Sequence, residues 1–359
     1  MSDKKFNRPQ QPTPPYPYIQ EEIAYPNQTD GITISGTLAM PNTVGAFPAV
    51  MLVSGMGPND RNYSMLGHQP FLVLADYLTR HGIAVLRVDK RGVGKSTGAF
   101  GPFVTSKDLA RDVQSGIDYL TTRKEIDRNA IGLIGHSEGG LIAAMVARQS
   151  QSVSFLILMA GAMVTGVEQV LTQVGMQLKA DGASKELIDY DAQVREKLLR
   201  VVKQESDADT AAAAMRSIMA AYFASLPVTV KAETEKLLFA IKESNAEDMI
   251  AFFNSPTYRY WLGHDCVSDL SAVHVPVLAM NGDLDFITVS SIQLPIIKKA
   301  LDSAGNRDAT IVDLPKMNHW FQSCSTGAMS EYGILQETIS PIVLGLIADW
   351  IRIRFVIKK

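Results

Sequence analysis

The chain has 359 residues, of which 46% are hydrophobic and 20% charged, and its formal net charge at pH 7 is −3. This length exceeds that of an average single domain, so we expect one α/β core that carries an insertion. The slightly negative charge, with Lys and Arg scattered along the chain, argues against nucleic acid as a partner.

No apolar stretch approaches the ~18 residues that a membrane span needs, and the first residues lack the apolar run of a signal peptide. We therefore expect a soluble protein, cytoplasmic as written, or exported if a signal segment has been removed. Cys266 and Cys324 are the only cysteines, too few for a disulfide scaffold and without the spacing of a zinc site. The simpler expectation is that both cysteines are free thiols, and the alternative is a single disulfide between them. The sequence does not indicate an oligomeric state.

Residues 8–18 are rich in proline and predict an extended arm, here taken as residues 1–19. Beyond the arm, strand and helix patterns alternate, which is typical of a parallel sheet flanked by helices. The expected strands are 32–40, half-exposed and antiparallel, then 49–53, 83–88, 131–135, 155–160, 275–280 and 309–314, and the expected helices are 70–80, 107–121, 141–148 and 334–353. Together they predict an α/β core domain over residues 20–164 and 267–359.

Residues 165–266 lack a buried-strand pattern and have helical spacing throughout. We interpret them as a helical cap, or lid, which we expect to emerge beside the catalytic end of the sheet and to shape the substrate site. Tyr258 and Trp261, where the cap rejoins the sheet, are candidate pocket residues, and the alternative is that they form part of the cap core.

A nucleophile motif lies at Gly135-His-Ser-Glu-Gly139, between a short apolar run and a helix-like stretch. A serine at a sharp strand-to-helix turn exposes its hydroxyl, and flanking glycines permit close packing of the backbone. The motif indicates a catalytic serine only if an acidic residue and then a histidine follow it along the chain. Ser137 is therefore the candidate nucleophile.

A serine hydroxyl needs an imidazole to take its proton and a carboxylate to fix the imidazole tautomer. His319 lies in a loop between the last expected strand and the final helix, which is the appropriate place. His136, next to the serine, is expected to point elsewhere. Two aspartates follow the strand at 275–280, and Asp285 is favoured because Asp283, beside a glycine, is well suited to stabilise the turn itself.

The chemistry also requires backbone N–H groups directed at the developing negative charge. Glu138 supplies one at the start of its helix. The second is expected from the loop after residue 53, with Met56 as first choice and Gly57 as second, since Pro58 has no N–H.

The segment Gly92-Val-Gly-Lys-Ser96 is similar to the end of a phosphate-binding loop, but the required glycine is replaced by Asp89. We therefore reject nucleotide binding. Asp89 and Arg91 are instead expected to tie loops together through charge-assisted hydrogen bonds. No metal or cofactor is expected.

The elbow motif, the loop that begins at Asp89, Asn281-Gly-Asp-Leu-Asp285 and Asn318-His-Trp-Phe-Gln322 together resemble the α/β-hydrolase superfamily. More narrowly, they are similar to EstD-like bacterial esterases of the serine aminopeptidase-like and dienelactone-hydrolase-like group. The resemblance implies an eight-stranded, mostly parallel sheet and a triad carried by Ser137, Asp285 and His319. It also implies hydrolysis of carboxylic esters without a cofactor.

The leading functional hypothesis is a carboxylesterase that acts on small-molecule esters through an acyl-enzyme. Trp320, beside the candidate histidine, is a further candidate pocket residue. One alternative is a peptidase or amidase that uses the same triad, and another is a non-catalytic binding protein with this fold. The acyl and alcohol specificities depend on cap packing that the sequence does not reveal.

Overall fold

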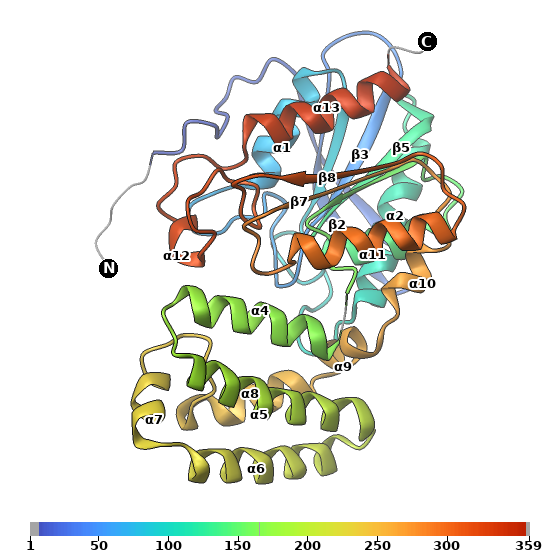
Figure 1. The fold of residues 1–359 in the computed structure, drawn as a ribbon. Coiled ribbons are helices and arrows are strands. Elements are labelled where there is room, and N and C mark those ends of the chain that lie inside the picture. The colour runs from blue at the N-terminus through green and yellow to red at the C-terminus, as the bar shows by residue number, and fades with distance from the viewer. Residues whose placement is uncertain (1–6, 165, 357–359) are drawn as a thin grey trace. The chain divides into compact units, whose positions relative to one another are not determined.

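The computed structural model describes residues 7–164 and 166–356, and the chain divides into two compact units. The larger unit comprises Met1–Gly101, Ser106–Met163 and Cys266–Lys359, and is α/β in character. The smaller unit comprises Pro102–Thr105 and Val164–Asp265 and is helical (Figure 1).

The larger unit is built on one eight-stranded sheet with the order β1-β2-β4-β3-β5-β6-β7-β8. β1 and β2 are antiparallel to their neighbours, and the strands from β4 to β8 along the sheet run parallel. The expected mostly parallel, eight-stranded α/β sheet is thus confirmed. The strands are β1 (Ile19–Asn27), β2 (Ile32–Met40), β3 (Phe47–Val53), β4 (Ala84–Val88), β5 (Ile126–His136), β6 (Phe155–Met159), β7 (Val277–Gly282) and β8 (Ala309–Leu314).

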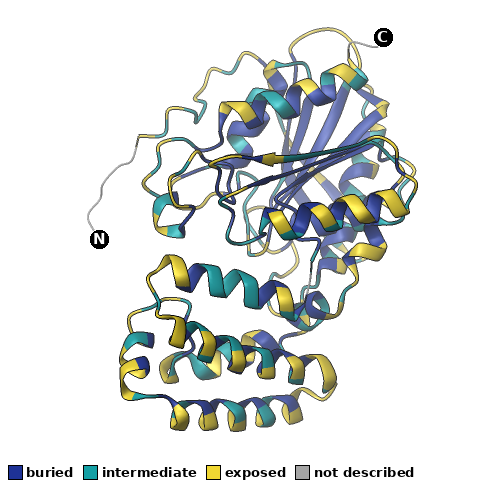
Figure 2. Ribbon diagram, viewed as in Figure 1, coloured by how far each residue is buried: buried dark blue, intermediate teal, exposed yellow. Residues whose placement is uncertain are grey.

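Helices cover both faces of this sheet. In Figure 1, α1 and α13 lie on one face, and α2 and α11 lie on the other. Figure 2 shows buried strands between helices whose outer sides are exposed, so the core lies between the sheet and its helices. The helices of this unit are α1 (Pro70–Arg80), α2 (Ser106–Thr122), α3 (Glu138–Ala147), α10 (Cys266–Leu270), α11 (Ser290–Ser303), α12 (Met329–Tyr332) and α13 (Pro341–Phe355).

Four features of the sheet unit differ from the sequence-based expectation. Strand β1 was not expected, although Ile23, Tyr25 and Asn27 are buried in strict alternation. β2 is not half-exposed, because it lies between β1 and β4 and is buried from residue 34 to 40. α11 was missed, and Pro295 inside it obscures the helical pattern. The last helix begins at Pro341, a residue that favours the first turn, and not at residue 334.

The described residues of the smaller unit form helices and connecting loops. Three of its helices begin at polar caps, because the side chains of Ser184, Asp207 and Ser255 accept hydrogen bonds from the backbone N–H three residues later. Their apolar faces form a core of their own. The helices are α4 (Val167–Ala180), α5 (Lys185–Gln204), α6 (Ala208–Ser225), α7 (Val228–Thr234), α8 (Ala246–Asn254) and α9 (Pro256–Gly263).

The structure also bears on cysteines, membranes and metals. Cys266 is buried, Cys324 is partly buried, and both carry thiols. Among residues 7–164 and 166–356, no helix has the length and apolar character that a membrane crossing requires. Over the same residues, no group of three or more His, Cys, Asp or Glu side chains is arranged to hold a metal ion.

The proline-rich arm is described from residue 7, and polar side chains of this part hydrogen-bond to the α/β unit. Arg8 donates to the carbonyl oxygens of Leu335 and Gly333 at 2.5 and 2.6 Å. The Gln10 amide donates to the Ile339 carbonyl at 2.7 Å and accepts from the Thr338 N–H at 2.5 Å. These partners lie in the irregular loop between α12 and α13, so the described part of the arm is attached to that loop.

Replacing Arg8 by alanine is expected to lower the free energy of unfolding by about 1–2 kcal/mol, because it removes charge-assisted hydrogen bonds to backbone carbonyls. Urea unfolding measures this change. Arg128→Ala is the matched control, since this arginine is exposed on β5, and it should change stability by less than about 0.5 kcal/mol. Equal midpoints for Arg8→Ala and the wild type would contradict a stabilising arm.

Candidate active site

Ser137 occupies the turn between β5, which ends at His136, and α3, which begins at Glu138. Its backbone has φ 58° and ψ −126°, a conformation that side chains other than glycine rarely adopt. Three hydrogen bonds hold it there: its N–H donates to the Met159 carbonyl at 3.0 Å, and its carbonyl accepts from Gly140 and Ala162 at 2.9 and 3.1 Å. Strain of this kind persists only where the surrounding structure enforces it.

Two glycines permit the close packing of this turn. A Cβ at Gly139 would lie 2.0 Å from the carbonyl oxygen of Val53, and one at Gly135 would lie 2.3 Å from the oxygen of Gly139. No other residue fits at either position without displacing the backbone. The turn therefore lies directly against the end of β3, where the expected oxyanion loop begins.

Asp285 and His319, from the loops after β7 and β8, are joined in the structure. The Nδ1 of His319 lies 2.8 Å from Oδ2 of Asp285, and the two residues are 3% and 1% exposed. Because a carboxylate only accepts hydrogen bonds, Nδ1 carries a proton, and in the neutral imidazole the free lone pair is then on Nε2. Asp285 is itself fixed, since its Oδ1 accepts from the N–H of Thr288 at 2.9 Å and its Oδ2 from the Thr288 hydroxyl at 2.7 Å.

Asp283, the other candidate carboxylate, is exposed and has a different partner. Its Oδ1 accepts from the N–H of Lys316 at 2.6 Å. This bond joins the two loops that carry Asp285 and His319. Of the two aspartates, only Asp285 is hydrogen-bonded to the histidine in the described structure.

His136 links the serine turn to the histidine loop. Its Nε2 lies 2.8 Å from the carbonyl oxygen of His319, and the two rings are 4.7 Å apart. A carbonyl only accepts, so Nε2 carries the proton, and Nδ1 accepts from the Tyr63 hydroxyl at 3.3 Å. The Tyr63 hydroxyl also packs against Gly55, where a Cβ would lie 2.6 Å from its oxygen. The expectation that His136 points elsewhere was therefore incomplete, because this ring connects the loops on both sides of Ser137.

The expected oxyanion donors lie next to the serine. A Cβ at Gly55 would lie 2.9 Å from the Cβ of Ser137, so the chain immediately before Met56 packs against the serine. Gly57 has a φ of +106°, which allows the loop to bend. Glu138 is the first residue of α3, and an N–H at that position has no acceptor within its own helix. The Glu138 carboxylate is engaged elsewhere, accepting from the Ser106 hydroxyl at 2.7 Å.

The three candidate pocket residues are all buried. Tyr258 and Trp261 are each 6% exposed and belong to the hydrophobic core of the helical unit. Trp320 is 7% exposed, and its ring packs on those of His68 and Tyr332 at 6.1 and 5.4 Å. It also lines a cavity of about 10 Å³. A role of these residues in substrate binding stays a prediction.

Sequence reasoning missed two residues that organise this site. Thr288 follows Asp285 by three positions, a spacing at which an aspartate accepts local backbone and hydroxyl hydrogen bonds, so a signal existed. Tyr63 gives no such signal, because its contact with His136 joins residues 73 positions apart.

The buried state of His136 leads to a prediction about acid stability. Burial lowers the pKa of His136 from 6.5 to about 3, and the neighbouring His319 adds to the shift. Between these two values the unfolded chain binds a proton that the folded chain does not, so stability is full above about pH 6.5 and falls as the pH drops toward 3.

We expect the free energy of unfolding of the wild type to fall by roughly 2 kcal/mol more than that of His136→Asn between about pH 7 and pH 5. Urea titrations at the two pH values measure the difference, and comparison with the variant cancels the contributions of other groups. Parallel losses in the two proteins would show that His136 is not buried in its neutral form.

Comparisons with known proteins bear on the family and the fold of the chain. A family model described as serine aminopeptidase, S33, matches residues 49–229, half of the chain. The chain is 30% identical over 119 residues to esterase EstD of Thermotoga maritima, and 30% identical over 129 residues to esterase FrsA of Yersinia pestis. These alignments cover 33% and 35% of this chain but only 28% of each relative.

Solved structures with the same fold cover most of the chain. The structure of DcsB in complex with its substrate analogue matches with a TM-score of 0.54 at 16% identity, over 93% of this chain and 98% of that one. The esterase Pf2001 of Pyrococcus furiosus matches with a TM-score of 0.50 at 14% identity, over 86% of this chain and 89% of that one. At such identities the likeness shows the α/β-hydrolase fold alone. On the match of the family model, this chain belongs to the serine aminopeptidase S33 family of α/β-hydrolases.

Proposed function

We propose that the protein is a serine hydrolase that cleaves carboxylic esters of small molecules through an acyl-enzyme on Ser137. The observation that carries the proposal is the buried 2.8 Å contact between Asp285 and His319, which leaves the imidazole Nε2 able to accept a proton. His136 connects this pair to the serine turn through the His319 carbonyl. The curated relatives named as esterases support an ester as substrate.

In the proposed acylation step, the Ser137 hydroxyl attacks the ester carbonyl and its proton passes to Nε2 of His319. The carbonyl oxygen becomes an oxyanion, which accepts hydrogen bonds from the backbone N–H of Met56 and Glu138. As the tetrahedral intermediate collapses, the C–O bond breaks and His319 returns the proton to the departing alcohol.

In the second half of the cycle, His319 takes a proton from water, and the hydroxide attacks the acyl carbon. As this second intermediate collapses, the bond to Ser137 breaks, His319 returns the proton to the serine oxygen, and the carboxylic acid is released. Asp285 stabilises the imidazolium in both halves and fixes the tautomer of the neutral imidazole.

A peptidase or amidase on the same residues is the second candidate, favoured by the description of the matched family model. The two candidates differ in leaving group. An ester hydrolase should turn over p-nitrophenyl esters much faster than aminoacyl p-nitroanilides of similar size, whereas an amidase should cleave both at comparable rates. A panel of acyl chains from acetyl to decanoyl, with feruloyl esters included, would define the acyl site.

Ser137→Ala should lower kcat for p-nitrophenyl ester hydrolysis by at least about 10⁴-fold, because no other group in the proposal forms the acyl-enzyme. The thermal unfolding temperature should stay within a few degrees of the wild type. Ester hydrolysis that survives in the folded variant would rule out Ser137 as the nucleophile.

The two aspartates give an internal comparison for the carboxylate. Asp285→Ala should lower kcat by about 10³- to 10⁴-fold, since the imidazole loses its tautomer control. Asp283→Ala is the matched control: it removes a carboxylate two residues away that accepts a hydrogen bond from the Lys316 backbone, and kcat should change by less than about tenfold. The reverse ranking would transfer the catalytic role to Asp283.

A further inference from the structure

Lys90 is a buried cation that the proposed reaction does not yet use. It lies in the loop after β4 between two charged residues that act structurally: Asp89 pairs with Arg61 at 2.8 Å, and Arg91 pairs with Asp112 at 2.7 Å. These ion pairs are the charge-assisted hydrogen bonds that the sequence predicted for Asp89 and Arg91. Lys90 is only 9% exposed, and its Nζ donates to the carbonyl oxygen of Gly55 at 2.5 Å.

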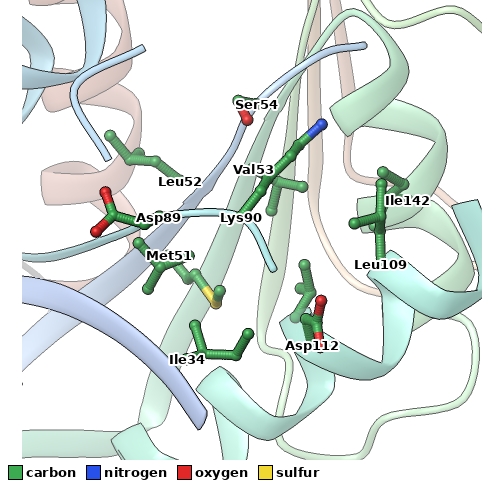
Figure 3. Close-up of a pocket in the computed structure, with 12 residues that line it drawn as sticks. Ile34, Met51, Leu52, Val53, Ser54, Asp89, Lys90, Leu109, Asp112 and Ile142 are labelled. Carbon is green, nitrogen blue, oxygen red and sulfur yellow. The ribbon is translucent and has the colours of Figure 1, made fainter. Parts of the chain in front are cut away.

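The surroundings of Lys90 are mainly apolar. With Val53, Leu109 and Ile142 it lines a cavity of about 30 Å³ beneath the end of β3. Figure 3 shows the amine of Lys90 and the carboxylate of Asp89 pointing in opposite directions. Burial lowers the pKa of Lys90, and the carboxylates of Glu138 and Asp112 partly oppose that shift.

Burying an ammonium group in apolar surroundings costs free energy unless hydrogen bonds compensate for the lost water. The groups that contact this ammonium therefore indicate its role. In the described structure, its hydrogen-bond acceptor is the Gly55 carbonyl. The ring of Phe100 lies 5.7 Å from the Nζ atom. The hydrogen bond of this amine is thus made to one peptide group of the loop beside Ser137.

That peptide group joins Gly55 to Met56. In a trans peptide, the C=O and N–H bonds point in opposite directions. Lys90 and the side-chain amide of Asn59, which donates to the same oxygen at 2.8 Å, hold the carbonyl end. The N–H of Met56 is consequently directed to the other side. Gly55 itself packs on Ser137, where a Cβ would lie 2.9 Å from the serine Cβ, so this peptide lies beside the nucleophile.

We propose that Lys90 is a positioning residue for the oxyanion hole: its ammonium group orients and polarises the Gly55–Met56 peptide so that the Met56 N–H is a fixed, strengthened donor. The inference rests on the proposed function, since it assumes that an oxyanion forms beside Ser137. Lys90 does not touch the substrate. It acts through the peptide, because a cation on a carbonyl oxygen draws electron density from the amide and makes its N–H a better donor.

A fixed donor matters because the loop that carries it has few side chains to hold its backbone. Gly55, Gly57 and Pro58 leave few side-chain contacts to hold the loop, and Met56 is 42% exposed. Oxyanion donors accelerate catalysis when they need no reorientation as charge develops. Lys90 and Asn59, which both donate to the Gly55 oxygen, fix the orientation of the peptide that carries the Met56 N–H.

Lys90→Met tests the inference, because methionine is similarly long and unbranched but has neither charge nor donor. Removing an oxyanion donor outright costs about 10²- to 10³-fold in kcat, so a misoriented donor should cost on the order of tenfold. KM should stay within about twofold, since the ground-state carbonyl is held less tightly than the oxyanion. Lys95→Met is the matched control: Lys95 is 73% exposed, pairs with Glu22, and its loss should leave kcat unchanged.

A transition-state analogue separates positioning from a general loss of structure. Ser137 adds to the carbonyl of an alkyl trifluoromethyl ketone and passes its proton to His319, so the ketone oxygen becomes an oxyanion in the same place. In Lys90→Met the inhibition constant should rise by about the factor by which kcat falls. The burst of product in the first turnover gives the concentration of intact active sites and corrects for misfolded protein.

Asn59→Ala is a second variant that leaves the buried charge in place and removes the other donor to the Gly55 oxygen. It should lower kcat, leave KM unchanged, and raise the inhibition constant of the ketone by about the factor by which kcat falls. Unchanged kcat and unchanged ketone binding in folded Lys90→Met would overturn the inference. If Lys90→Met does not fold, the same result in Asn59→Ala would overturn it. The proposed function is judged separately, by wild-type turnover against Ser137→Ala.

Discussion

The constraint on which the rest of the structure depends is the close packing of the turn at Ser137 against the end of β3. Gly139 and Gly135 leave room for backbone atoms where any side chain would collide, and the serine is held at a positive φ. This contact brings the carboxyl ends of β3 and β5 together. The loops that leave those strands then meet at the same edge of the sheet, as expected for a parallel α/β fold.

Hydrogen bonds then connect the loops that meet at this edge. His136 bonds the carbonyl of His319 and accepts from Tyr63, and the Tyr63 hydroxyl packs against Gly55, so the serine turn, the histidine loop and the loop before Met56 are connected. His136 is buried and its pKa is low, which keeps its donor and acceptor nitrogens distinct near neutral pH. A network with fixed proton positions holds reactive groups more accurately than flexible loops alone.

The sequence predicted those parts of the fold and site that depend on local patterns. The glycine spacing around Ser137 and the alternation of strands and helices are properties of neighbouring residues, and both indicated the correct elements. Asp285 was preferred to Asp283 by turn chemistry, and in the structure it contacts His319. Tyr63 and Lys90 were not recognised, because each matters through a contact with a residue distant in sequence. The start of the last helix was misplaced because the irregular loop before it retains helical spacing.

The central claim is that Ser137 is an activated nucleophile whose reactivity depends on His319. Peptide mass spectrometry after treatment with a fluorophosphonate tests this most directly, because the reagent adds to a serine only when its hydroxyl is activated. We expect a single adduct on the peptide that contains Ser137 in the wild type, and a rate of labelling lower by at least about 10³-fold in folded His319→Ala. An adduct on another residue, or equal labelling rates in the two proteins, would contradict the account.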